Sequence, residues 1–163
     1  MSVSISEYEL ERLEYFLKGD KQALLLCLDM VYVGHLWDDL IDKDRVRTND
    51  EINQAFMKSF RGIPDNPFFK KWQGALQPLL IQTAQAYVDS THLEMGDDDE
   101  RLMSFLCRNQ CLQFIQHVVY VVGIDHGEPD WITQVSVDFW KTFRWANKLR
   151  YFMFEEKKLS VVS

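Results

Sequence analysis

The sequence is poor in the residues that mark the turns of β-structure. Its 163 residues include only 7 glycines and 4 prolines, whereas strand-rich folds need frequent turns built from these residues. No segment shows the sustained polar–apolar alternation of strands, and the short apolar run 118–122 lies within a helical pattern. Disorder is excluded as well, because 47% of the residues are hydrophobic and 13% are aromatic. The sequence therefore predicts an all-α fold.

Cysteine is also scarce, and no targeting segment is visible. The 3 cysteines form no CxxC pair, and an odd number in apolar helical sequence favours buried thiols in a reducing compartment. Residues 1–12 carry neither the basic nor the apolar region of a signal peptide. The longest apolar runs, which Asp29, His35 and His117 interrupt, are shorter than the ~20 residues that a membrane span requires. These absences predict a cytoplasmic protein without a membrane span.

Basic residues are in the minority. The chain has 18 lysines and arginines against 25 aspartates and glutamates, which gives a formal net charge of −7. Nucleic-acid binding is disfavoured, because neutralising phosphates requires a basic surface. An acidic chain is instead suited to metal ions or to a basic protein surface.

Helix start and stop signals divide the chain into six segments. The first begins with a capping box at Ser6, and the fourth contains Gly74 and Pro78, where we expect a kink or a division into two helices. We predict a single all-α domain over residues 1–158, a bundle of about six helices, followed by a frayed tail over 159–163. The predicted helices run over residues 6–18, 20–44, 48–62, 67–95, 99–122 and 130–158.

Three aspartates and a histidine lie at the end of the most apolar segment, residues 24–42. This segment predicts a central helix that is buried around most of its circumference. At 100° per residue the four side chains share one face with the apolar residues upstream. Carboxylates on an inward face repel one another and lose solvation unless a cation compensates. We predict Asp38, Asp39 and Asp42 as ligands of Mg²⁺ or Mn²⁺, with His35 as a candidate ligand-binding residue. The alternative is a solvent-exposed helix end whose acids pair with nearby basic residues.

Residues 32–42, YVGHLWDDLID, resemble the first aspartate-rich helix of the isoprenoid synthase superfamily, closest to its squalene and phytoene synthase branch. In that family the acids hold Mg²⁺ ions that bind and ionise a prenyl diphosphate inside a helical barrel. The resemblance implies that Asp38, Asp39 and Asp42 hold the ions and that the ligand is a phosphorylated molecule or a diphosphate. Diphosphate departure needs several ions held by two facing acid clusters. One cluster is visible here, so we expect binding rather than catalysis.

Two further polar groups lie on later helices. On the fifth, Gln113 and His117 belong to a stripe of polar residues at helical spacing, which either lines a cavity or faces solvent. On the sixth, Lys141, Arg144 and Lys148 recur at i, i+3 and i+7. They either contact the phosphates of a ligand or favour the negative end of the helix dipole. We take these five residues as candidate ligand-binding residues.

Two functions from different classes remain open at this stage. The first is a small divalent-metal-binding helical protein that binds a phosphorylated ligand. The second is a non-enzymatic acidic interaction protein, such as a regulatory or phage-encoded factor, that docks on a basic partner surface through acidic stretches such as 38–44 and 97–100. A homodimer is compatible with either. A transition metal held by single histidines on different helices is a further alternative.

Overall fold

Every regular element of the described chain is a helix. The computed structural model describes residues 5–43 and 45–143, so the predicted tail and the end of the sixth predicted helix lie outside the described residues. The all-α prediction is confirmed. The elements in chain order are α1 (Glu7–Phe16), α2 (Lys21–Asp42), α3 (Asn49–Met57), the π-helix η1 (Lys58–Gly62), α4 (Ile63–Asp65), α5 (Pro67–Lys71), α6 (Gln73–Leu93), α7 (Asp98–Arg108), α8 (Gln110–Asp125) and α9 (Trp131–Thr142).

The first two helices begin where their capping side chains predict. The Ser6 hydroxyl accepts the backbone N–H of Glu9 at 3.2 Å, and the Glu9 carboxylate accepts the backbone N–H of Ser6 at 2.9 Å. Asp20 caps α2 by accepting two backbone N–H groups, each at 2.9 Å. The helix ends at Asp42, and the residue that caps it, Lys43, has the left-handed φ of 57°. The long helix that carries the aspartates is therefore as predicted.

Two predicted helix boundaries in the middle of the chain are wrong, and one expected division is found. Gly62 does not end the third helix, because its φ of −54° and ψ of −57° are helical and the chain continues through η1 into α4. The fourth segment divides into two helices as expected, at Trp72, whose φ is −110° and which lies two residues before Gly74, while Pro78 lies inside α6. The fifth segment divides at Asn109, where the backbone N–H of Leu112 bonds to the Asn109 carbonyl at 3.0 Å and so shortens the helical turn.

Two helices contribute most of the hydrophobic core. Helix α8 is buried on several sides, with Phe114 at 1% exposed. Helix α2 buries Leu26 completely, yet Leu25 is 48% and Leu40 is 42% exposed. The expectation that α2 is buried around most of its circumference is therefore wrong for these positions, since its neighbours cover one side. Other fully or almost fully buried side chains are Leu13, Phe16, Leu17, Cys27, Leu76, Val118, Val119, Val121, Val122 and Phe139.

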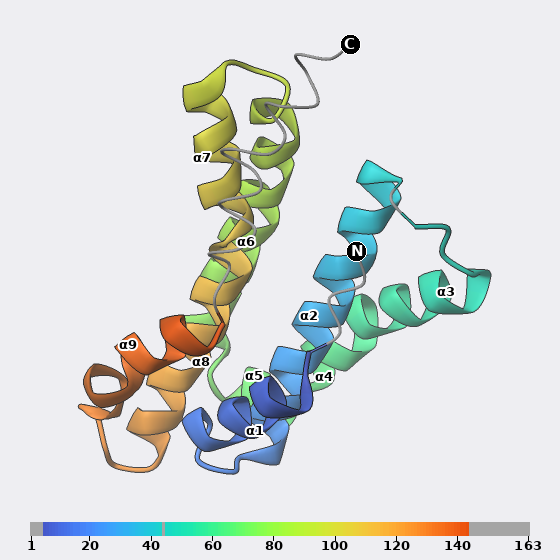
Figure 1. The fold of residues 1–163 in the computed structure, drawn as a ribbon. Helices are drawn as coiled ribbons and strands as arrows, with labels where there is room; N and C mark the ends of the chain where they lie inside the picture. Colours follow the sequence, from blue (N-terminus) through green and yellow to red (C-terminus); the bar gives the residue numbers. More distant parts are fainter. Residues whose placement is uncertain (1–4, 44, 144–163) are drawn as a thin grey trace.

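The two ends of the described chain pack together. The indole N–H of Trp131 on α9 donates to the backbone carbonyl of Phe16 at 2.9 Å, and the rings of Phe16 and Phe139 have centroids 5.6 Å apart. Figure 1 shows α6, α7 and α8 alongside one another, with α2 and α3 on the other side and α1 and α5 at one end. Among the described helices, none has the length and apolar character that a membrane crossing requires.

Candidate functional site

The three aspartates at the end of α2 do not point to one common centre. The carboxylate of Asp39 is buried, with 7% of its side chain exposed, and it contacts the segment that follows α2. The carboxylates of Asp38 and Asp42 have 38% and 24% of their side chains exposed, and both contact α7 instead. The side chains on this helix face therefore contact two different segments, the one that follows α2 and α7.

Asp39 is neutralised by Arg47, which precedes α3. The Arg47 Nε donates to the Asp39 carboxylate at 2.6 Å, and a second guanidinium nitrogen donates to Glu51 at 2.9 Å. Burial lowers the pKa of Arg47, but its hydrogen bonds to Asp39 and Glu51 and the negative charges of these two residues together raise the pKa above its ordinary value. The arginine therefore stays charged and provides the cation that a buried carboxylate requires.

Arg108 takes the same role for the other two aspartates. One guanidinium nitrogen of Arg108 lies 3.4 Å from Asp38 and 3.2 Å from Asp42, and another donates to Glu94 at 2.5 Å. The Tyr87 hydroxyl also donates to Asp38 at 2.9 Å. Burial and the charge of Asp38 raise the pKa of Tyr87, so this phenol keeps its proton and remains a donor. The network joins the ends of α2, α6 and α7.

A fourth acid of α2 is compensated in the same manner. Asp29 is 4% exposed and accepts a hydrogen bond from the ammonium of Lys58, the first residue of η1. The Lys58 ammonium also lies 5.3 Å from the centre of the Tyr32 ring. Lysine and arginine side chains from later segments thus compensate all four acids.

The present arrangement does not fit an oxygen-only metal centre at Asp38, Asp39 and Asp42. Arg108 lies between the carboxylates of Asp38 and Asp42, whereas Asp39 is turned toward Arg47. Within residues 5–43 and 45–143, no group of three or more His, Cys, Asp and Glu side chains has an arrangement that could hold a metal ion. His35 lies half-buried on α2, one turn before the aspartates. The magnesium or manganese site stays a prediction, and a bound ion would have to displace an arginine.

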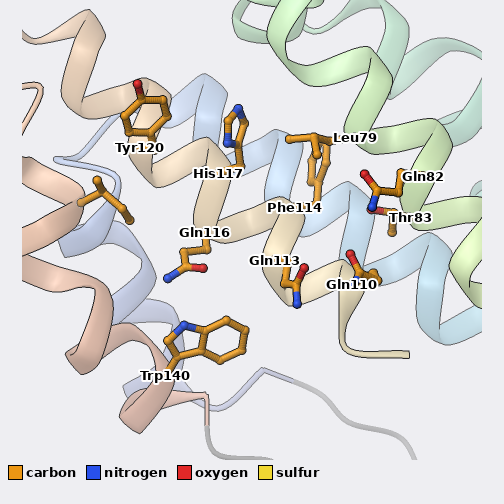
Figure 2. Close-up of a pocket in the computed structure, with 11 residues that line it drawn as sticks. Leu79, Gln82, Thr83, Gln110, Gln113, Phe114, Gln116, His117, Tyr120 and Trp140 are labelled. Atoms are coloured by element: carbon orange, nitrogen blue, oxygen red, sulfur yellow. The ribbon is translucent and has the colours of Figure 1, made fainter. Parts of the chain in front are cut away.

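A groove of about 450 Å³ lies between α6, α8 and α9 (Figure 2). It brings together Gln113 and His117, the two candidate residues on the fifth predicted helix. Lys141 is exposed on α9 and lies outside the groove lining, and Arg144 and Lys148 lie outside the described residues. The polar residues Gln113 and His117 therefore line a cavity. Of the three predicted basic residues, the structure describes only Lys141, which does not line it.

The described residues that line the groove mix polar with apolar side chains, and none of them is a carboxylate, lysine or arginine. Burial lowers the pKa of His117 below its ordinary value, so the ring is neutral at pH 7. The Gln116 amide donates to the Ser136 hydroxyl at 2.7 Å, and the rings of His117 and Tyr120 have centroids 5.4 Å apart. The lining that sequence reasoning missed comes from α6, where Leu79, Gln82 and Thr83 recur at i, i+3 and i+4. The sequence shows this spacing, but it does not show that α6 packs beside α8 to form a groove.

An exposed apolar cluster forms a third feature, on the outer side of α3 and η1. Phe56, Met57 and Phe60 are 54%, 56% and 76% exposed, and the rings of Phe56 and Phe60 are stacked, with centroids 5.9 Å apart. We call these three residues the Phe56–Phe60 surface. Single exposed apolar side chains are common, but clusters of them mark interaction sites.

Comparison with family models, curated proteins and solved structures finds no match to this chain. The resemblance of residues 32–42 to isoprenoid synthases therefore stays a prediction that rests on those residues alone.

Proposed function

We propose that this chain is a non-enzymatic interaction protein of the cytoplasm, which docks on a basic partner protein through the Phe56–Phe60 surface. The observation that carries the proposal is the stacked pair of phenylalanines on the outside of α3 and η1, beside an equally exposed methionine. In the folded chain these side chains lose the free energy that burial would provide. A partner that covers them recovers it.

The composition of this surface is typical of a binding hot spot. Aromatic residues, methionine and arginine are enriched at interface centres, with polar residues at the rim. Here Phe56 and Phe60 are one helical turn apart. The exposed side chains of Asn53, three residues before Phe56, and Arg61, next to Phe60, provide polar groups close to them in sequence. The π-turn of η1 places Phe60 at a local widening of the helix, a feature that is frequent at functional sites. This supports insertion of the helix face into an apolar groove of the partner.

The net charge indicates the kind of partner. At −7, the chain is attracted to a positively charged surface over a Debye length of about 8 Å at physiological salt, and two copies of it repel one another. A basic partner with an apolar groove is therefore favoured over a homodimer. Charge complementarity of this kind accelerates association and makes it sensitive to salt.

Ion pairs support a structural role for the α2 aspartates. Arg47, Arg108 and Lys58 hold the acids of α2 in place, which is the role of a stabilising network. The magnesium-dependent binding of a phosphorylated ligand remains the alternative function. It requires Arg108 to leave Asp38 and Asp42, and the Discussion gives its test.

A photo-crosslinking experiment tests the docking surface. A benzophenone amino acid is placed at Phe60 in one variant and at Gln134, an exposed position of α9, in a matched control. Both are irradiated in cells that produce the protein, and crosslinked products are identified by mass spectrometry. We expect one basic protein to crosslink at position 60 and not at position 134.

The crosslinked protein is then purified, and its affinity for the wild type and for two alanine variants is measured by calorimetry. We expect Phe60→Ala to weaken binding roughly thirtyfold or more, the factor that corresponds to about 2 kcal/mol at a hot spot. Gln134→Ala should leave the affinity unchanged, and added salt should weaken it. A product containing only this chain, an acidic partner, or equal affinities for both variants would contradict the proposal.

A further inference from the structure

The groove between α6, α8 and α9 has the chemistry of a specific small-molecule site. Its volume of about 450 Å³ lies within the range of about 300–1,000 Å³ that is usual for ligand pockets. Three helices build it, so its walls are held by the packing of the bundle rather than by a loop. It lies on a different part of the fold from the Phe56–Phe60 surface, which belongs to α3 and η1.

Amide side chains provide most of the hydrogen-bonding groups. Gln82, Gln110 and Gln113 line the groove, and none of their amides makes a side-chain hydrogen bond to another part of the chain that the structure describes. Each amide offers two donors and an acceptor with two lone pairs. Such groups recognise a planar edge that carries a donor beside an acceptor, as glutamine does with adenine.

Aromatic rings provide the complementary faces. Trp140 and Tyr120 line the groove and are 38% and 37% exposed. Figure 2 shows the Trp140 ring of α9 across from the amides of Gln113 and Gln116 on α8. The ring of Phe139 meets Trp140 edge-on at a centroid distance of 5.7 Å and supports its orientation. An exposed indole beside the Gln113 amide, which makes no side-chain hydrogen bond within the described residues, is arranged to stack on a flat, polar ring.

The charge of the described lining disfavours ionic ligands. Within residues 5–43 and 45–143, the side chains that line the groove include no carboxylate, lysine or arginine, and the one histidine among them has a pKa lowered by burial. An anionic ligand would meet no cation in the lining and an overall charge of −7, while a cationic ligand would lack a carboxylate to pair with. The described lining therefore favours a neutral ligand.

We propose that this groove binds a neutral planar heterocycle with adjacent hydrogen-bond donors and acceptors, the chemistry of a nucleobase or nucleoside. Trp140 stacks on the ring, and the amides of Gln113 and Gln82 bond to its edge. The site takes the free base or nucleoside and not a nucleic-acid chain, because the acidic surface repels a phosphate backbone.

The test is a calorimetric titration of the full chain with adenosine and uridine, with ribose as the control that lacks the heterocycle. We expect saturable binding of a nucleoside in the millimolar range or tighter and none of ribose. Adenosine 5′-monophosphate should bind no more tightly than adenosine. Absence of nucleoside binding, equal binding of ribose, or clearly tighter binding of the monophosphate would overturn the proposal.

Substitutions of lining residues test whether the nucleoside binds in the groove. Trp140→Ala should weaken nucleoside binding roughly fivefold or more, because the ring loses its stacking partner, and Trp140→Phe should retain most of the affinity. Gln113→Leu should weaken it while the exposed control Gln134→Leu on α9 should not. Circular dichroism checks that each variant is folded, and Gln113→Leu decides the outcome if Trp140→Ala is unfolded. Unchanged affinity in Gln113→Leu and in a folded Trp140→Ala would overturn the assignment.

Discussion

Arg47 covers the carboxylate of Asp39 so closely that 9% and 7% of the two side chains remain exposed, with Nε 2.6 Å from the carboxylate oxygen. The pair connects the end of α2 to the start of α3. A buried ion pair of this kind adds little over an apolar pair, but removal of one partner leaves an uncompensated charge. The pair therefore fixes the geometry of this corner of the fold.

We expect Arg47→Met to destabilise the protein by about 3–5 kcal/mol, the usual cost of leaving a buried carboxylate without its partner. Arg45→Met is the matched control, because Arg45 contacts the same Glu51 but is 44% exposed, and exposed pairs contribute about 0–1 kcal/mol. Urea unfolding measures both. Equal urea midpoints for the two variants would show that the Arg47–Asp39 contact is unimportant.

The acid sensitivity of the fold should depend on Glu51. Hydrogen bonds from the backbone of Thr48 and from the side chain of Arg47 lower the pKa of Glu51 from its ordinary 4.5 to about 2. A lowered pKa contributes stability above the unfolded-state value, and this contribution disappears as the pH falls from about 4.5 to 2. We expect the stability difference between wild type and Glu51→Gln to be constant above pH 5 and to shrink below it. A difference that grows on acidification would refute the assignment.

Adjacent leucines of α2 provide a test of its orientation. Leu26 is completely buried whereas Leu25 is 48% exposed. We expect Leu26→Ala to cost about 2–5 kcal/mol of unfolding free energy, because it leaves a cavity, and Leu25→Ala to cost well under about 1 kcal/mol. Chemical unfolding of the two variants decides. The reverse order would mean that α2 is rotated relative to the core.

Two helical glycines should respond in opposite directions to a methyl group. A Cβ at Gly123 would lie 2.8 Å from the Glu128 carbonyl oxygen and 2.8 Å from Cβ of Trp131, so Gly123→Ala should destabilise the turn between α8 and α9. A Cβ at Gly34 would meet no atom within 4 Å, so Gly34→Ala should stabilise α2 by about 0.5–1 kcal/mol. Thermal melting compares them, and two shifts of the same sign would count against these packing environments.

Helix starts could be predicted because their signals are local. Ser6, Asp20 and Thr48 each bond to backbone groups two or three residues away, and such contacts are encoded in short stretches of sequence. The continuation of the helix through Gly62 and the division at Asn109 could not be predicted. Gly62 packs against the carboxylate of Asp29 on α2, since a Cβ there would lie 2.9 Å from it, and this contact is absent from the local sequence.

The candidate sites show the same limit. Helical spacing correctly grouped Gln113 and His117 on α8, because that pattern lies within one helix. The same spacing placed the α2 acids on one helix face, but their side chains contact different partners. Helical spacing could not predict which residues of other helices contact these side chains. Arg108 lies 66 residues after Asp42, which it contacts, and Trp140 closes the groove from a helix that starts beyond α8. The alternative of acids paired with nearby basic residues holds for Asp39, whose partner Arg47 lies eight residues later. The partner of Asp38 and Asp42, Arg108, comes from a distant segment.

Arginines pair with the carboxylates at the end of α2. We therefore propose that binding takes place at the Phe56–Phe60 surface and in the groove between α6, α8 and α9, and not at these carboxylates. The most direct test compares melting temperatures in Mg²⁺ and in EDTA, at matched ionic strength, for wild type and Arg108→Gln. We predict no Mg²⁺-specific shift in wild type and a rise in Arg108→Gln, where Asp38, Asp42 and Glu94 lose the guanidinium that they share. A Mg²⁺-specific rise in wild type that is abolished by Asp38→Ala with Asp42→Ala would contradict the account and establish the aspartates as metal ligands.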